Sequence, residues 1–321
     1  MTAFPAILKP SRDDRPILIA ALFIVAILIA GTAYTWERFG SAPLLSPTYL
    51  LQQLQIGAFL GIVAAGQMVV ILISQIDLSI PWTLSAAAMM ATAIGGDWAI
   101  PIGLAAGLAV GLVNGLGVAY LRIPSMIFTL GMNAVMRGLM VAHTGGFAPQ
   151  TRATALMRAL AAEHVYGIPN ALFVWIAVSA IVAVMLQRTT LGRSIYALGN
   201  KEAAAYLAGV NTKGVTIVCF ALCGLTAGLA GVLLAGYSQN AYQGMGDPYL
   251  LPAIAAVVIG GANILGGRGR YLGTLVGVIL IVLLNSVLSI MEMPEAGRQV
   301  IYGAVIILML LVYGRGEQVT S

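Results

Sequence analysis

A few polar side chains interrupt the long apolar runs of this chain, and they are the groups best able to do chemistry. They comprise one carboxylate, one guanidinium, amides and a hydroxyl: Asp77, Ser79, Gln67, Asn114, Asn133, Arg137 and Asn285. An ionisable group at membrane depth is costly unless it meets water or a partner. These residues therefore indicate either hydrogen bonds to a hydroxylated solute or hydrogen bonds that tie helices together.

The segment around Asp77 allows two interpretations. Asp77 lies in the sequence SQIDLS (74–79), and Pro81 follows closely enough to break a continuous helix there. In the first interpretation, a broken helix lines a path through the membrane. In the second, Asp77 caps a helix at the cytoplasmic rim.

Catalytic chemistry has little support in this sequence. The only two histidines, His143 and His164, bracket a predicted extracytoplasmic loop, and we find neither paired carboxylates nor a phosphate-binding glycine-rich loop. Cys219 and Cys223 are four residues apart in one apolar run, which favours buried small hydrophobes over a disulfide or a metal site. We therefore expect a non-enzymatic chain with no metal and no cofactor of its own.

Composition places these residues in a membrane protein. Apolar residues make up 60% of the 321 positions and charged residues only 8%, against about 25% charged in soluble domains. Apolar stretches near the ~20 residues that cross a bilayer recur along the chain. The sequence therefore predicts an all-α, polytopic inner-membrane bundle of about ten transmembrane helices, some of them broken.

The predicted organisation is a single membrane domain over 16–313, with a tail at each end (1–15 and 314–321) and one long loop (188–214). The ten predicted spans follow the apolar runs: 16–35, 50–75, 81–96, 98–120, 124–144, 168–187, 215–237, 249–262, 272–290 and 297–313.

Cations set the expected orientation. With both termini inside, eleven of the 16 lysines and arginines are cytoplasmic. Four fall outside (Arg38, Arg152, Arg158 and Arg298), and Arg137 stays within a span. This bias favours cytoplasmic N and C termini.

The loop 188–214 is the most basic interruption of the apolar sequence, with four cations against one carboxylate. Helix-forming residues fill Lys201–Leu207, Asn200 is placed as an N-cap, and Gly209 as a C-terminal stop. The prediction is a short, alanine-rich helix on the cytoplasmic side that docks a soluble partner.

Two segments resemble each other within the chain. The sequence PWTLSA from Pro81 resembles PYLLPA from Pro248, and each run reaches an Ile-Gly-Gly. Downstream of each, an intramembrane asparagine, Asn114 or Asn285, precedes a proline by about ten residues. In the predicted topology the two units cross the membrane in opposite senses, as in transporters with inverted repeats.

Three motifs in order give the chain a family resemblance. They are Ile76-Asp77-Leu78-Ser79, the loop from Leu191-Gly192-Arg193 through Gly199-Asn200 to Gly209-Val210, and Ala255–Gly261 with Leu265-Gly266-Gly267. From about residue 50 to 313 the chain resembles the permeases of ribose-type ABC sugar importers, which are related to branched-chain amino acid permeases. It departs from that family's pattern at Ser74-Gln75, where the family often has glycines.

The resemblance implies partners and roles. It implies a permease dimer or a pair with a paralogue, a cytoplasmic ATPase that uses ATP and Mg²⁺, and a periplasmic binding protein that delivers a sugar for alternating access. The residues carried over to ATPase coupling are Gly199, Asn200, Ala203, Ala204 and Gly209. A branched-chain amino acid or another small solute stays an alternative, as does a gradient-driven secondary transporter, although that class usually needs more intramembrane carboxylates.

Overall fold

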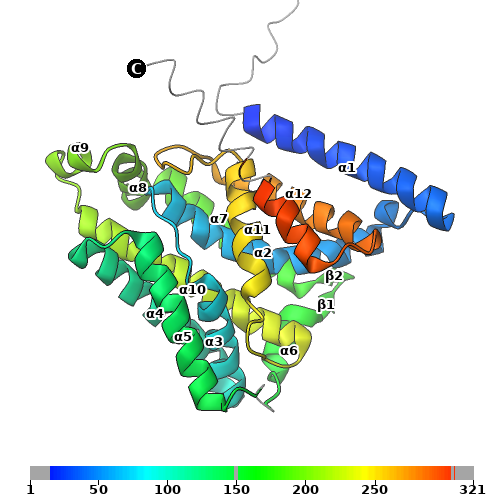
Figure 1. Ribbon diagram of the computed structural model, residues 1–321, viewed down its shortest axis with the longest axis horizontal. Coiled ribbons are helices and arrows are strands. Elements are labelled where there is room, and N and C mark those ends of the chain that lie inside the picture. Colours follow the sequence, from blue (N-terminus) through cyan, green and yellow to red (C-terminus); the bar gives the residue numbers. More distant parts are fainter. Residues whose placement is uncertain (1–14, 148–150, 305–306, 308–321) are drawn as a thin grey trace, which may run out of the picture.

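The computed structural model describes residues 15–147, 151–304 and 307, and these form a mostly helical bundle (Figure 1). Seven of the described helices are long and apolar enough to cross a membrane. They are α1 (Arg15–Phe39), α2 (Pro47–Leu72), α4 (Ala99–Leu121), α5 (Ser125–Thr144), α7 (Asn170–Arg188), α10 (Thr212–Ser238) and α12 (Tyr271–Ile290).

Shorter elements complete the described chain. The helices are α3 (Ile80–Ile94), α6 (Ala155–Ala162), α8 (Thr190–Asn200), α9 (Glu202–Leu207), α11 (Leu250–Ile259) and a helix over 295–304. Single 3₁₀ turns are η1 (Pro43–Leu45), η2 (Gly96–Trp98) and η3 (Asp247–Tyr249), and β1 (His164–Val165) pairs antiparallel with β2 (Ile168–Pro169) in a two-stranded hairpin.

The predicted spans coincide with helices, with one correction. The ranges 81–96 and 249–262 were predicted to cross the membrane, but α3 has 15 residues and α11 has 10. At 1.5 Å per residue they reach about 22 and 15 Å, short of the ~30 Å hydrocarbon core. The irregular segment 73–79 precedes α3, and the 3₁₀ turn η3 leads directly into α11, so both are half-length helices. The predicted span 297–313 and the tails 1–15 and 314–321 fall largely outside the described residues.

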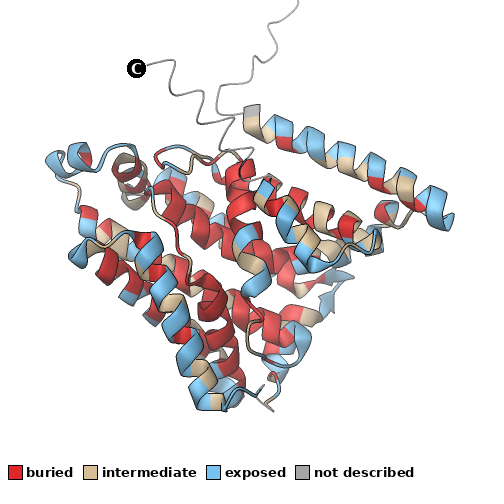
Figure 2. Cartoon of the chain, in the orientation of Figure 1, coloured by how far each residue is buried: buried red, intermediate tan, exposed pale blue. Residues whose placement is uncertain are grey.

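The core of the bundle is built on α2 and α10. Both are buried along most of their length, whereas α1 is exposed along its outer side (Figure 2). The helices α4 and α10 pack closely because glycines face each other: a Cβ on Gly107 would lie 2.3 Å from the Gly224 carbonyl oxygen, and one on Gly224 would lie 2.2 Å from that of Gly107. Small residues at four-residue spacing permit such helix contacts where both neighbours are apolar.

The helices have two distinguishable ends, which we name by α9 and α6. The end of α2 contacts the end of α8 and the loop before α12, so all three lie at the α9 end. The end of α10 packs against α6, because a Cβ on Gly236 would meet the Met157 carbonyl oxygen. It follows that α2 and α4 run toward the α9 end, whereas α10 and α12 run away from it. The predicted opposite senses of the two units are therefore present.

Candidate functional site

The two half-length helices start beside each other inside the bundle. After α2 ends at Leu72, residues 73–79 return into the interior and α3 begins there (Figure 1). The loop before α11 approaches the same place: Gly246 N donates to Ser85 Oγ (3.0 Å), and a Cβ on Gly246 would lie 2.1 Å from the Pro81 carbonyl oxygen. Half-helices whose N-termini meet at depth are typical of solute permeases.

Asp77 lies at the break between α2 and α3, where its carboxylate organises a buried cluster. Asp77 Oδ1 accepts hydrogen bonds from Ser79 N (2.8 Å) and Ser79 Oγ (2.7 Å). On α4, Asn114 Nδ2 donates to Ser79 Oγ at 2.8 Å and approaches both carboxylate oxygens at 3.5 Å. Asp77 and Ser79 are each 1% exposed and Asn114 is fully buried. The broken helix is therefore present, and the cluster lies inside the protein.

Hydroxyl groups of α5 hold the same segment from its other side. Leu78 N donates to Thr129 Oγ1 (2.9 Å), and Ile76 N donates to Ser125 Oγ (3.2 Å). The backbone donors that a continuous helix would satisfy internally are satisfied here by side chains. The predicted residue Gln67 lies deeper along α2, where its Oε1 is 3.8 Å from Cys223 Sγ, while Gln67 Nε2 has no described partner.

Asn133 and Arg137 form a second group on α5, next to the start of α3. Asn133 Oδ1 accepts from Trp82 N (3.3 Å), and the Arg137 guanidinium lies 5.8 Å from the centre of the Trp82 ring. Arg137 is exposed in the described chain although it lies within a membrane-length helix. A cation facing lipid at that depth would cost about 3 kcal/mol, so this face of α5 must meet water or another protein surface.

Asn285 stands apart from these groups and lines a cavity of about 440 Å³ toward the α6 end. The cavity lies between α2, α12, the loop before α11 and the helix over 295–304. We call it the four-tyrosine cavity, because Tyr49, Tyr242, Tyr249 and Tyr302 line it. Of the predicted path residues, Asn285 alone is among its lining residues.

The basic loop contains two helices where one was predicted. The predicted helix is present as α9, but its N-cap position is Lys201 and not Asn200. Asn200 is instead the last residue of α8, and its Nδ2 donates to the Tyr196 carbonyl oxygen (3.0 Å). The helix α8 was not predicted; it is stabilised by burial of Ile195 and Leu198 against the bundle. Gly209 ends α9 as predicted, with a φ of +83°.

The outer surface of α9 is exposed, and this helix occupies a corner of the molecule (Figures 1 and 2). Ala203 and Ala204 are exposed, Ala205 faces inward at 4%, and Tyr206 and Leu207 are 69% and 85% exposed. A short helix that presents small and apolar side chains to solvent has the shape of a docking element.

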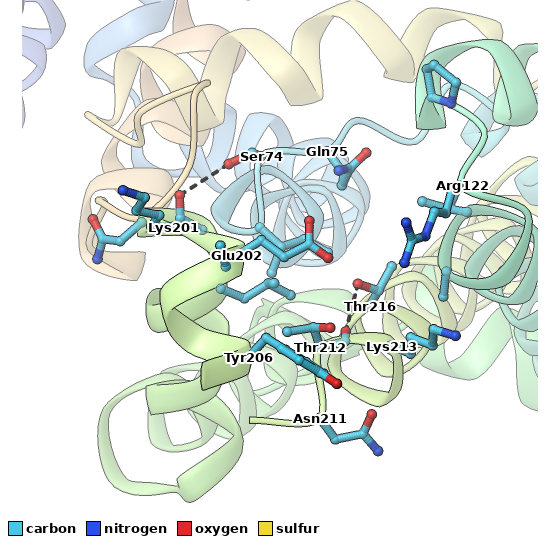
Figure 3. A pocket seen from close by; sticks show the side chains of 18 of the residues that line it. Ser74, Gln75, Arg122, Lys201, Glu202, Tyr206, Asn211, Thr212, Lys213 and Thr216 are labelled. Atoms are coloured by element: carbon cyan, nitrogen blue, oxygen red, sulfur yellow. Dashed lines mark hydrogen bonds between the residues drawn. The ribbon is translucent and has the colours of Figure 1, made fainter. Parts of the chain in front are cut away.

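A cavity of about 1040 Å³ lies beside α9, between it, the turn joining α4 to α5, and the start of α10 (Figure 3). Three cations and one carboxylate line it: Arg122, Lys201, Lys213 and Glu202. Gly199, Asn200 and Ala203 also line it, so three of the five predicted coupling residues border a basic, open cavity.

A contact among three motif segments fixes α8 to the bundle. Gly199 packs so closely that a Cβ there would lie 1.8 Å from the Leu72 carbonyl oxygen. Gly267 N donates to that same oxygen (2.9 Å). Ser74 Oγ donates to the Leu265 carbonyl oxygen (2.6 Å) and lies 3.3 Å from the Gly199 carbonyl oxygen. We call this contact the α8 anchor.

The path residues predicted from the sequence therefore lie in three separate places in the fold. Asp77, Ser79 and Asn114 come together, with Gln67 near them; Asn133 and Arg137 meet Trp82; and Asn285 lines the four-tyrosine cavity. The tyrosines and the roles of Ser74 and Gly246 were missed. These residues are distant in sequence and share no motif, so only the glycine turn near Gly246 offered a local signal.

Comparison with known proteins agrees with this architecture. The chain is 36% identical to the ribose import permease protein RbsC of Escherichia coli (strain K12), over 82% of this chain and 84% of the relative. It is 32% identical to the RbsC protein of Bacillus subtilis (strain 168), over 84% and 85%. It is 31% identical to the autoinducer 2 import system permease protein LsrC of Escherichia coli O9:H4 (strain HS), over 96% and 89%. No solved structure matches the chain.

A multi-pass helical bundle with half-length helices that meet in its interior defines a membrane permease. The sequence profile of one permease family, described as the branched-chain amino acid transport system permease component, matches residues 49–310. The chain belongs to this family.

Proposed function

We propose that this chain is the membrane-spanning subunit of a bacterial ABC importer, which moves a monosaccharide or similar small polyol across the inner membrane by alternating access. The observation that carries this proposal is the family match over 49–310, together with relatives that import ribose and autoinducer 2. In this proposal, the subunit does no catalysis. ATP and Mg²⁺ act in a separate cytoplasmic ATPase, and a periplasmic binding protein delivers the solute.

The docking site for the ATPase in this proposal is the exposed surface of α9. Ala203 and Ala204 are small and exposed, so a soluble partner could approach them directly. The α8 anchor would transmit movement of α9, because it joins α8 to the end of α2 and so to the segment that carries Asp77. Gly199 fits this role by close packing, and Gly209 by ending the helix.

A second copy of the chain, or a paralogue, would cover the exposed face of α5. The support is physical: Arg137 is exposed within a membrane-length helix, and pairing two such faces around an aqueous path removes it from lipid. Asn133 and Trp82 would border the same path.

The α9 assignment is tested by bulky, charged substitution. We expect Ala203→Arg and Ala204→Arg to reduce ATPase co-purification with a tagged permease by about tenfold, since a loss of ~1.4 kcal/mol in docking suffices for that factor. The matched control is Ala155→Arg, which changes an exposed alanine on α6 at the other end of the molecule. Native amounts of ATPase with both α9 variants would remove α9 from the docking surface.

A second candidate, an importer of branched-chain amino acids, is favoured by the family description. Uptake of labelled D-ribose and L-leucine, compared in cells with and without the complete importer, distinguishes the two. Leucine uptake that depends on this chain, with no sugar uptake, would replace the sugar proposal.

A further inference from the structure

The four-tyrosine cavity combines the features of a small-molecule site. Its volume of about 440 Å³ falls within the 300–1,000 Å³ usual for ligand pockets. Several segments distant in sequence line it, including α2, α10 and α12, so its shape depends on the fold and not on one flexible loop. It lies toward the α6 end, which is the outer end in the predicted orientation.

The aromatic part of the wall offers flat surfaces with polar edges. Tyr49 comes from α2, Tyr242 and Tyr249 from the loop before α11 and its 3₁₀ turn, and Tyr302 from the helix over 295–304. Tyrosine rings supply rigid apolar area while their hydroxyl groups hydrogen-bond. A sugar has the matching surface, with faces of C–H groups and edges of hydroxyl groups.

The polar part of the wall retains hydrogen-bonding capacity for a ligand. Arg298 Nη1 donates to Asn285 Oδ1 (2.8 Å), which fixes the amide and leaves its Nδ2 donors unused among the described residues. The Gln53 side chain makes no hydrogen bond to any described residue, and Gln53 lines the cavity. Tyr49 Oη and Ser286 Oγ are hydrogen-bonded at 2.7 Å, which joins α2 to α12 at the wall of the cavity.

The charged residues at the cavity disfavour the binding of an anionic solute. Among the described lining residues Glu295 is the one charged side chain, and Arg298 Nε lies 3.5 Å from its Oε2. None of the described lining residues is a lysine or arginine that could receive a phosphate or an α-carboxylate. Because Arg298 is already paired with Glu295, such a group would lose hydration without gaining an unpaired cation, at a cost in binding free energy.

We propose that the four-tyrosine cavity binds an uncharged polyol of monosaccharide size and rejects amino acids and phosphorylated sugars. This inference rests on the proposed import function and assigns its solute a place and a chemistry. Asn285 and Gln53 donate to the hydroxyl groups, and the tyrosine rings contact the C–H faces. The loop that carries Tyr242 and Tyr249 also packs on the start of α3, so a solute in the cavity would contact a loop that touches the interior junction of the half-length helices.

Solute protection of an introduced thiol tests the site directly. The full importer complex is prepared with Cys219→Ala and Cys223→Ala, and then with either Gln53→Cys or Gln52→Cys. Position 53 lines the cavity, whereas the adjacent Gln52 is exposed and lies outside its lining. The rate of alkylation is measured with a panel of neutral polyols (D-ribose, D-xylose, D-glucose and myo-inositol), with ribose 5-phosphate and with L-leucine.

We expect at least one neutral polyol to slow alkylation at position 53 about tenfold at ten times its Kd, because only the unoccupied fraction reacts. Position 52 should react at the same rate with and without solute, and leucine and ribose 5-phosphate should not protect position 53. Protection by no polyol, or equal protection by leucine, would overturn the proposal. Protection that follows lipid composition instead of sugar would also overturn it, by making the cavity a lipid site.

Solute uptake by the wild-type complex, compared with protection at position 53, shows whether the cavity proposal or the import proposal has failed. Sugar uptake by the wild type without protection at position 53 would reject the cavity and keep the importer. Uptake of leucine alone would reject both.

Discussion

At the scale of single residues, the intramembrane polar groups serve different purposes despite their similar appearance in the sequence. Asp77 accepts hydrogen bonds from Ser79 and approaches Asn114 within a buried cluster. Asn285 instead faces a cavity. The carboxylate at the helix break thus fixes the backbone there, whereas the asparagine is available to a solute.

Asp77→Ala should lower both the apparent Tm of the purified permease and the rate of solute uptake. The substitution removes the acceptor for two Ser79 donors and leaves buried groups unsatisfied, which costs about 1–3 kcal/mol. Asp77→Asn keeps an acceptor oxygen and should lose less. Thermal unfolding in detergent and uptake by the full importer are the measurements, with Asp97→Ala on the exposed turn η2 as the control. An Asp77→Ala protein with wild-type Tm and uptake would contradict the role of the cluster.

At the scale of elements, α8 and α9 depend on one compact contact with the bundle. The α8 anchor joins the end of α2, the end of α8 and the loop before α12. Ser74 is central to it and has a φ of +63°, a left-handed conformation that glycine adopts without strain. Its hydroxyl offsets this strain by donating to the Leu265 carbonyl oxygen at 2.6 Å. This bond explains how a serine is tolerated in a left-handed conformation here.

Two substitutions of Ser74 distinguish the effect of backbone strain on stability from the effect of hydrogen bonding. We expect Ser74→Ala to destabilise the permease by about 1 kcal/mol, since it loses the hydrogen bond to Leu265 and keeps the strain. Ser74→Gly loses the same bond but relieves about 1 kcal/mol of left-handed strain, so its stability should be closer to that of the wild type. The apparent Tm and ATPase co-purification of both variants are compared with those of Gln75→Ala. A glycine variant less stable than the alanine variant would contradict this account of Ser74.

At the scale of the whole molecule, the positions of the cations agree with the directions in which the helices run. The described cations expected on the cytoplasmic side, such as Arg122, Lys201 and Arg268, belong to segments at the α9 end. Arg158 lies on α6 at the other end. The segregation predicted from sequence is therefore present in the fold, and the direction in which the bundle is inserted stays a prediction.

Labelling of single cysteines tests that direction. In a chain lacking Cys219 and Cys223, we introduce Arg158→Cys, Lys201→Cys or Arg268→Cys at positions that are all exposed. An impermeant thiol reagent should label intact cells at position 158 alone, because the α9 end faces the cytoplasm. All three should react once the membrane is opened, which controls for accessibility. Labelling of position 201 in intact cells would invert the orientation.

The sequence by itself determined the class, most helix positions and the ends of several elements. Long apolar runs require helices in a membrane, because every backbone donor must be satisfied within the segment. Pro81 marks the start of α3 and Gly209 the end of α9 for reasons local to each residue. The exposure of α9 was likewise predictable from a polar, basic segment between apolar runs.

Only the tertiary structure decided which polar residues meet. Asn114 reaches Ser79 across 35 residues, and Tyr49 reaches Ser286 across 237. Such pairs depend on how the helices pack, and neither hydrophobic periodicity nor propensity encodes a partner. The same reason explains the errors in the basic loop, where contacts of Gly199 and the buried side chains of α8 extend a helix through Asn200 and move the cap to Lys201. The four-tyrosine cavity exists only where several distant segments close around one space.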